Sequence, residues 1–438
     1  MESLKHQRDD FPWVICGVLL LATLLNYMDR QALAVTLPTL KQQFHLTESR
    51  VGMIEGSFGI AFAVGSIIFG WIADRTGPRW LYPVVLAGWS LAGIATSWAG
   101  QPWIESWLAT PTDPPGTAVY HWLLLCRVAL GICEAGHWPC ALLTVRAILN
   151  PNERTLGNGI LQSGASIGAI LVPLYVEAAD RAGQPWQFPF WSIGIAGLAW
   201  VPLWLTFTRR LPLAPAPKPV VSASDSAKSE SAKSDRQWTG ESVRRLVVLA
   251  IIVATLTISW QFLRAWLALF LQDHHGYSKQ ATRGLMSGYF IAADVGCILS
   301  GILVTRLTRQ GWGINAARKF GYLLFTILTA CGALIPYAPD GWPMIGLLFL
   351  TGAGILGLHP FYYALTQDLV HHRMGVLSGF LAAGGWIVSS LSQIYLGRHI
   401  EATKSYELGL LVVGLAPTIG LIALWTLWPR DTTPATAR

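Results

Sequence analysis

Residues 70–79 have the sequence GWIADRTGPR, a short charged stretch that lies between two apolar segments, 51–73 and 80–99. Each segment is at least about 20 residues long, which is the length that an α-helix needs to cross the hydrocarbon core of a bilayer. The sequence therefore predicts two membrane-spanning helices joined by a short polar loop.

The composition of the whole chain favours a membrane protein. Hydrophobic residues make up 53% of the 438 residues and charged residues only 13%, whereas a typical soluble domain has about 25% charged residues. This argues against a water-soluble enzyme, whose surface needs more charge. The net charge of +7 comes from basic residues that lie between apolar stretches, which indicates a lipid bilayer rather than nucleic acid as the partner.

Ten other segments have the same apolar character, so we expect an all-α integral membrane protein with twelve transmembrane helices. The strands of a membrane β-barrel are about 10 residues long and alternate strictly in polarity, a pattern that this chain lacks. The expected spans are approximately 13–37, 51–73, 80–99, 119–148, 156–178, 188–207, 245–272, 282–305, 319–338, 342–369, 373–397 and 406–428.

The lysines and arginines predict the orientation of the chain. Most of the 31 Lys and Arg residues fall in connections on the same side as both termini, and the outer connection 100–118 has none. Because basic loops stay on the cytoplasmic side, we expect both termini in the cytoplasm. A polar stretch rich in Pro, Ser and Ala near the chain midpoint predicts a flexible linker. The expected domains are a six-helix bundle over 1–210, a cytoplasmic linker over 211–242 and a second six-helix bundle over 243–438.

The two predicted bundles echo each other. The connection at 301–306 repeats part of the loop at 70–79, with Thr305 in the place of Asp74. An internal repeat around a central linker is typical of transporters whose two halves rock about a site near the bilayer midplane.

The loop at 70–79 resembles the signature loop of the major facilitator superfamily, G-x-x-x-D-R-x-G-x-R. The residues that carry this pattern are Gly70, Asp74, Arg75, Gly77 and Arg79. NYMDR at 26–30 and RVALGICEAGHWP at 127–139 look like motifs of the anion:cation symporters within that superfamily, and are most similar to the bacterial hexuronate and other sugar-acid:proton symporters. The resemblance implies two pseudo-symmetric six-helix bundles, alternating access, and a gate at Asp74 and Arg75.

Three features depart from the family pattern. Thr305 replaces the signature aspartate of the second loop, which implies a weaker charge lock there, and the linker is longer than the family leads us to expect. Arg264 lies in span 7 where the family pattern has an apolar residue, so the resemblance does not identify the exact substrate. Gly164-x-x-x-Gly168 in span 5 predicts a close helix approach and resembles only a fragment of an antiporter motif, which favours symport.

Charged residues inside the predicted spans also indicate a transporter, independently of the resemblance to a family. They are Asp29, Arg30, Glu55, Arg127, Glu134, Arg264 and Asp294. A charge at mid-bilayer costs about 2.5–3.5 kcal/mol, so these side chains must face one another or a watery cavity. Arg127 and Glu134 are two turns apart and share one face of span 4. We therefore expect the site on span 4 and on span 1, which carries Asp29 and Arg30.

This combination of charges suits a proton-coupled carrier of an organic anion. The planar fork of an arginine matches a carboxylate, and a carboxyl group in low-dielectric surroundings can carry a proton whose affinity a nearby arginine modulates. We hypothesise that Arg30 or Arg127 binds the substrate carboxylate and that Asp29 and Glu134 take the co-transported protons. The resemblance to the sugar-acid symporters carries the protonation role onto Asp29 and Glu134, residue for residue.

Other residues extend the expected site. Arg264 is either a second anion contact or an ion-pair partner of Asp294 or Glu55, and those two carboxylates are more often structural. The neutral candidates for binding substrate hydroxyls or stacking on the sugar are Tyr27, Gln162, Gln261, Trp386 and Gln393. Trp386 and Gln393 are seven residues apart on one face of span 11, which allows a joint role.

The sequence contains no H-E-x-x-H, P-loop, G-x-S-x-G or C-x-x-C motif, so we expect neither an enzyme nor a metal, and no cofactor apart from the co-transported proton. The leading hypothesis is a monomeric inner-membrane symporter that imports a sugar acid such as a hexuronate. An organophosphate or other organic anion antiporter of the same fold stays open. So does a spinster-type lipid carrier, whose first span also begins Asn-Tyr-x-Asp-Arg.

Overall fold

The computed structural model describes residues 11–110, 112–149, 154–209, 211, 213, 240–367 and 374–428. Nearly all of the predicted linker 211–242 lies outside these residues. In the described part of the chain every regular element is a helix and no strand is found, as the composition predicts. The elements are α2 (Phe11–Phe44), α3 (Glu48–Thr76), α4 (Pro78–Thr96), α5 (Pro102–Leu108), α6 (Thr117–Glu134), α7 (His137–Ile148), α8 (Arg154–Arg181), α9 (Phe188–Thr208), α11 (Gly240–Leu269), the π-helix η2 (Phe270–His274), α12 (Lys279–Arg309), α13 (Ile314–Ala330), the 3-10 helix η3 (Cys331–Tyr337), α14 (Trp342–Gln367), α15 (Met374–Thr403) and α16 (Glu407–Thr426).

The helices confirm the predicted membrane architecture. Within the described residues, ten helical segments are long and apolar enough to cross a bilayer, and the two remaining expected spans form α4 and α8. Large apolar side chains on the outside of the bundle are well exposed, for example Ile67 (64%), Val84 (66%) and Ile298 (63%). Such a surface is suited to lipid, since it is too apolar to be stable in water.

Prolines explain where two expected spans are broken. The span predicted over 119–148 divides into α6 and α7, because Pro139 has no N–H to donate to the carbonyl of Ala135. The span predicted over 319–338 ends in η3, which contains Pro336. The connection 100–118 also holds the short helix α5, which the sequence analysis did not predict.

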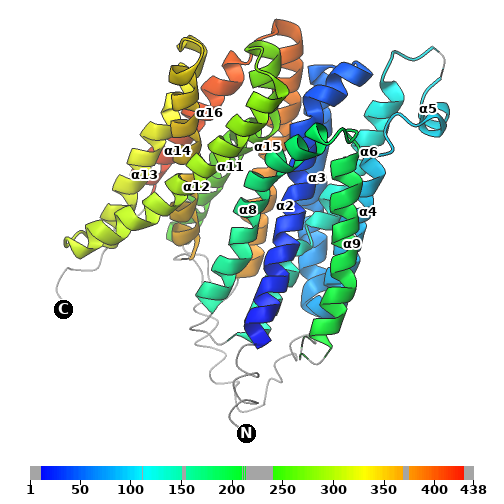
Figure 1. The fold of residues 1–438 in the computed structure, drawn as a ribbon. Coiled ribbons are helices and arrows are strands. Elements are labelled where there is room, and N and C mark those ends of the chain that lie inside the picture. Colours follow the sequence, from blue (N-terminus) through cyan, green and yellow to red (C-terminus); the bar gives the residue numbers. More distant parts are fainter. Residues whose placement is uncertain are drawn as a thin grey trace.

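The two halves of the chain repeat the same helix packing. In the first half α2 packs on α8, α3 on α6 and α4 on α9, and in the second half α11 packs on α15, α12 on α14 and α13 on α16. These pairs correspond one to one when the six spans of each half are numbered in order. Figure 1 shows the helices of residues 11–208 on one side of the molecule and those of residues 240–428 on the other. The predicted internal repeat is therefore a repeat of structure.

Glycines set how closely the helices approach. A Cβ at Gly164 would lie 2.4 Å from the carbonyl oxygen of Leu20, and one at Gly168 would lie 2.8 Å from the carbonyl oxygen of Leu24. Real Cβ atoms are excluded at these distances by steric overlap, so α8 lies on α2 only because these two residues lack one. The predicted close approach in span 5 is confirmed.

The two halves meet through α3 and α15 and through α8 and α12. At the centre of the first contact, a Cβ at Gly52 would lie 2.5 Å from the carbonyl oxygen of Gln393 and 3.0 Å from the Cα of Gly397. The backbones of α3 and α15 are thus in direct contact here. This contact continues along the helices as far as Phe62, whose ring centroid is 5.0 Å from that of Trp386.

Ion pairs join the halves at one end of the molecule. We call the end at which α9 ends and α11 begins the linker end. At the opposite end, Lys41 Nζ of α2 lies 2.5 Å from a carboxylate oxygen of Asp273 in η2. There Arg283 of α12 also pairs with Glu177 at 2.7 Å and with Asp180 at 2.8 Å, both on α8. These contacts hold the two halves together at the end opposite the linker.

Candidate functional site

A buried ion pair joins α2 to α6 in the first half. Nε and Nη2 of Arg30 donate to Oε2 of Glu134 at 3.0 and 2.6 Å. The exposed fractions of these residues are only 4% and 0%. A pair of charges this well buried needs both partners, because either one alone would be a costly uncompensated charge. The charged residues that the sequence analysis expects on the first and fourth spans are therefore in direct contact.

Aromatic rings surround the guanidinium of Arg30. Its central carbon lies 5.1 Å from the ring centroid of Tyr27, 5.2 Å from that of Phe58 and 5.3 Å from that of Phe62. The ring of Trp386, on α15 in the other half, is 5.6 Å away. These distances allow cation–π attraction, which is strongest where water is excluded. The structure thus brings the predicted residues Tyr27 and Trp386 to Arg30.

The sequence analysis gave Glu55 a structural role and missed Phe58 and Phe62. The spacings of three and four residues between them place all three on one face of α3. This helical pattern around an intramembrane charge is the signal that could have found them.

Glu55 lies between two arginines. Its Oε2 accepts a hydrogen bond from Nη2 of Arg264 on α11, in the second half of the chain. Its Oε1 is 3.6 Å from Nη2 of Arg127 on α6. Nε of Arg264 also donates to the side-chain oxygen of Gln261, and Arg127 donates to the backbone oxygen of Arg30 at 3.4 Å. Together with the Arg30–Glu134 pair, these residues form one network of buried charges, hereafter the charge network.

Asp29 is buried beside the charge network but makes no hydrogen bond with the described residues. Only 3% of it is exposed, and neither carboxylate oxygen has a partner. It faces α4, where a Cβ at Gly93 would lie 2.8 Å from Oδ1 of Asp29. Its neighbour Arg30 points to Glu134, so the two adjacent charges in span 1 point in different directions.

Three other predicted or considered residues have different surroundings. Gln393 accepts a hydrogen bond from the indole of Trp266 at 2.5 Å, whereas Trp386 on the same helix faces Arg30. Asp294 accepts from Ser166 at 2.9 Å, so Arg264 pairs with Glu55 and not with Asp294. Gln162 lies in α8, and its side chain is outside the described residues.

The signature loop lies at the linker end, between α3 and α4. Gly77 has φ +72°, in the region of positive φ that favours glycine, and caps both helices. Arg79 donates to the backbone oxygen of Arg209 at 3.0 Å and so ties the loop to the end of α9. Gly70 has open space beside its Cα.

Of the two charged residues in the proposed gate, the structure describes the side chain of Arg75 but not that of Asp74. The guanidinium of Arg75 stacks 3.6 Å from the ring centroid of Trp71. The side chain of Asp74 lies outside the described residues, so the predicted salt bridge of this gate stays a prediction.

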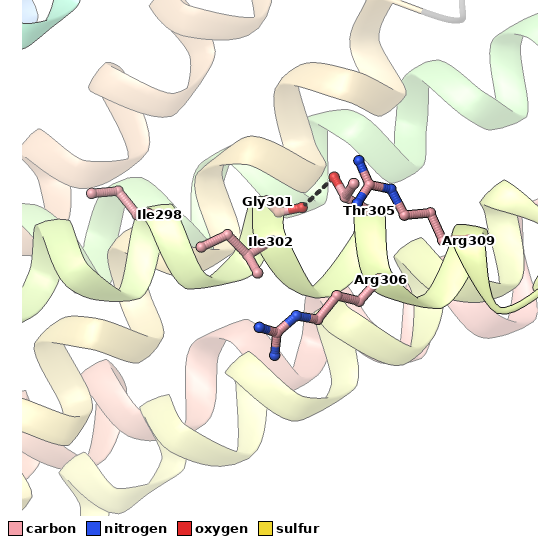
Figure 2. A pocket seen from close by; sticks show the side chains of 6 residues that line it. All are labelled: Ile298, Gly301, Ile302, Thr305, Arg306 and Arg309. Carbon is pink, nitrogen blue, oxygen red and sulfur yellow. Dashed lines mark hydrogen bonds between the residues drawn. The ribbon is translucent and has the colours of Figure 1, made fainter.

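The corresponding segment of the second half lies at the end of α12. Figure 2 shows the side chains there, with Thr305 bonded back to the backbone oxygen of Gly301 at 3.0 Å and Arg306 directed away from Thr305. These residues line an open surface hollow of about 490 Å³. None of the charged residues at the centre of the bundle lines this hollow, which is therefore separate from the charge network.

Comparisons with known proteins identify the family of the chain. A family model described as Major Facilitator Superfamily matches residues 19–393. A probable sulfoacetate transporter of Cupriavidus necator is 25% identical over 421 residues, which are 94% of this chain and 92% of that protein. The hexuronate transporter of Escherichia coli K12 is 23% identical over 436 residues, 98% of this chain and 95% of that protein.

The fold matches a solved structure. The crystal structure of a D-xylose–proton symporter aligns with a TM-score of 0.76 at 14% identity, over 95% of this chain and 98% of that one. The named relatives also confirm the resemblance to sugar-acid transporters that the motifs indicate. Because the family model covers most of the residues and the helices have the same arrangement, the chain belongs to the Major Facilitator Superfamily of membrane transporters.

Proposed function

We propose that this protein is a proton-coupled symporter that imports a sugar acid, such as a hexuronate, across the inner membrane by alternating access. The observation that carries the proposal is the buried Arg30–Glu134 pair inside a ring of aromatic side chains. A guanidinium fork can bind the substrate carboxylate, and aromatic faces can stack on a sugar while water is excluded. One relative is named a hexuronate transporter and another a probable sulfoacetate transporter, and both of these substrates are organic anions. These names support an organic anion as the substrate.

Glu134 provides the link between proton and substrate. Charge-assisted hydrogen bonds are about twice as strong as neutral ones. When Glu134 takes a proton, only the guanidinium stays charged, so the pair loses the attraction between opposite charges and the guanidinium is free to bind an incoming carboxylate. When the proton leaves, Glu134 competes with the substrate for Arg30 and promotes its release. Binding and protonation therefore favour each other.

Asp29 is the second proposed proton carrier. Protonation of Asp29 breaks no hydrogen bond, because neither of its oxygens has a donor in the described residues. A buried carboxylate without a partner is costly while it is charged, so a proton on Asp29 stabilises the closed packing of α2 against α4. Proton movement at this residue therefore acts on the helix that carries Arg30.

Alternating access requires that the two ends open in turn. The predicted orientation, with basic connections inside, makes the linker end cytoplasmic and the end joined by Lys41 and Asp273 periplasmic. The structure then corresponds to the state in which the periplasmic end is closed. The signature loop at Gly77 and Arg79 acts at the other end when the halves rock back.

An organophosphate antiporter remains the alternative, because the first helix of each half carries a buried arginine, Arg30 on α2 and Arg264 on α11. Both arginines are already paired with carboxylates, Glu134 and Glu55. A site that holds two carboxylates beside its arginines suits proton exchange better than a permanent phosphate cage, and so favours the symporter.

The test is uptake of labelled glucuronate or galacturonate into proteoliposomes under an imposed pH gradient, acidic outside. We expect accumulation that collapses with a protonophore and is abolished in Asp29→Asn. The matched control is Glu241→Gln, since Glu241 pairs only with Arg245 near the start of α11 among the described residues. Uptake that ignores the gradient would refute proton coupling, and uptake of glycerol 3-phosphate alone would favour the antiporter.

A further inference from the structure

Glu55 fits imperfectly between its two arginines. One oxygen is bonded to Arg264, but the other lies 3.6 Å from Arg127, which is too long for a hydrogen bond. That oxygen, Oε1, has no donor, and Nη1 of Arg264 has no acceptor among the described residues. Glu55 is 3% exposed and Arg264 4% exposed, so both side chains are shielded from bulk water. The guanidiniums of Arg127 and Arg264 therefore have hydrogen-bond donors that Glu55 does not accept from.

The buried carboxylates Asp29, Glu55 and Glu134 equal the guanidiniums of the charge network in number, so the charges become unbalanced only when the proposed proton carriers are protonated. Arg30 and Glu134 form one closed pair, and the remaining two guanidiniums, of Arg127 and Arg264, share the single carboxylate of Glu55. If Asp29 and Glu134 both carry protons, three guanidiniums face one carboxylate. A monoanion then leaves one buried positive charge without a counterion, which is costly, whereas a dianion balances both.

We propose that the transported substrate is a dianion with negative groups at its two ends, and that Arg264 and Arg127 bind the second group where Glu55 now lies. The proposal rests on the transport of an organic anion proposed above, and it puts sugar dicarboxylates or comparable dianions in the place of the monoanionic hexuronate given there as an example. Arg30 holds the first carboxylate. The second displaces Glu55 from Arg264 and gains the donors that Glu55 leaves unused.

The first end of the substrate thus meets only the first half of the protein, whereas the second end meets Arg264 of the second half together with Arg127 of the first. Arg30 belongs to the first half, on α2, and Arg264 to the second half, on α11. Because these helices correspond in the structural repeat, a molecule with two similar ends matches the symmetry of the site. Arg264 is then the residue that selects dianions over monoanions.

The experiment compares two acyclic six-carbon acids that differ only at one end. Galactarate carries a second carboxylate where galactonate carries a hydroxymethyl group. We expect the purified full-length protein to bind galactarate at least about tenfold more tightly than galactonate, which is the worth of one additional charge-assisted contact. Binding is measured by calorimetry at one fixed pH. Equal affinities for the two acids would overturn the proposal.

Variants assign the selectivity to Arg264. In Arg264→Gln the ratio of the two affinities falls to near one, and Arg245→Gln, at a site outside the charge network, keeps the wild-type ratio. The double variant Glu55→Gln/Arg264→Gln removes both partners of the ion pair, so that no unpaired charge prevents folding, and its ratio is also near one. A ratio that stays high in both Arg264 variants would overturn the assignment.

Three further outcomes separate the dianion proposal from the proposed function. Tighter binding of glycerol 3-phosphate than of galactarate would place both charges at one position and contradict two separated anion contacts. If galactonate and hexuronates bind while galactarate does not, the dianion proposal is wrong and anion transport stands. If none of the sugar acids binds, the proposed function itself fails, and the dianion proposal with it.

Discussion

Glu134 receives both hydrogen bonds of Arg30 on a single carboxylate oxygen. Nε and Nη2 of Arg30 reach Oε2 at 3.0 and 2.6 Å, while Oε1 of Glu134 has no partner in the described residues. The free oxygen can take a proton without breaking either bond. The ion pair is therefore arranged so that protonation weakens it before it separates.

The first prediction concerns Glu134→Gln. The amide oxygen of Gln can still accept from Arg30, but the side chain cannot carry a proton. We expect pH-gradient-driven accumulation in proteoliposomes to be lost while one-for-one exchange of substrate at equal pH survives. Glu241→Gln should accumulate substrate as the wild type does. Accumulation that survives unchanged in Glu134→Gln would show that another group carries the proton.

The second prediction concerns Arg30→Lys. Lysine keeps the positive charge but cannot present two N–H groups in one plane to a carboxylate. We expect kcat/KM for uptake to fall by at least about tenfold, the effect of losing one charge-assisted hydrogen bond. Arg245→Lys is the matched control at the start of α11. Wild-type uptake by Arg30→Lys would mean that charge alone is sufficient at this position.

The third prediction concerns the ion pairs at the end opposite the linker. Lys41 lies 2.5 Å from Asp273 and 3.0 Å from Glu48, and partly exposed pairs of this kind contribute about 1 kcal/mol or less each. Lys41→Gln should therefore shift the protein up to about fivefold toward the state open at this end.

Spin labels at positions 42 and 280, in a background without the six native cysteines, measure this shift as a larger population of long distances. The matched control is Arg245→Gln, at the linker end. An unchanged distance distribution in Lys41→Gln would show that the Lys41–Asp273 pair does not hold the end closed.

The fourth prediction concerns Gly52→Ala. The added Cβ would lie 2.5 Å from the carbonyl oxygen of Gln393, and overpacking of this kind typically costs about 1–3 kcal/mol. We expect lower thermal stability and weaker closure of α3 on α15, measured by unfolding of the purified protein and by the same spin labels. Gly17→Ala, which meets no atom within 4 Å, should be neutral. Equal effects of the two substitutions would contradict the close approach.

The sequence was sufficient to predict the spans, because about 20 consecutive apolar residues have few alternatives to a transmembrane helix. The halves could be recognised because the loop at 70–79 is echoed at 301–306. The break in the helix at Ala135 was harder to predict from the sequence, since a membrane helix can contain a proline without breaking. Whether Pro139 kinks or divides the helix depends on the packing around it.

The site could be predicted only in part. Arg127 and Glu134 share a helix face, which their spacing shows directly. The sequence analysis named Asp294 and Glu55 as alternative ion-pair partners of Arg264, but it could not decide between them. The pairing of Glu55 with Arg264 joins residues 209 positions apart, and depends on how α3 of one half lies against α11 of the other, which no local pattern encodes.

The link between Glu55 and Arg264 has a consequence for how the carrier cycles. It joins α3 of the first half to α11 of the second, so any motion that parts these helices must separate two buried charges. An incoming anion and its protons can compensate that separation, whereas an empty carrier has nothing to compensate it. We therefore expect the protein to reorient slowly when it carries protons but no substrate, which prevents protons from leaking inward without cargo and preserves the gradient that drives uptake.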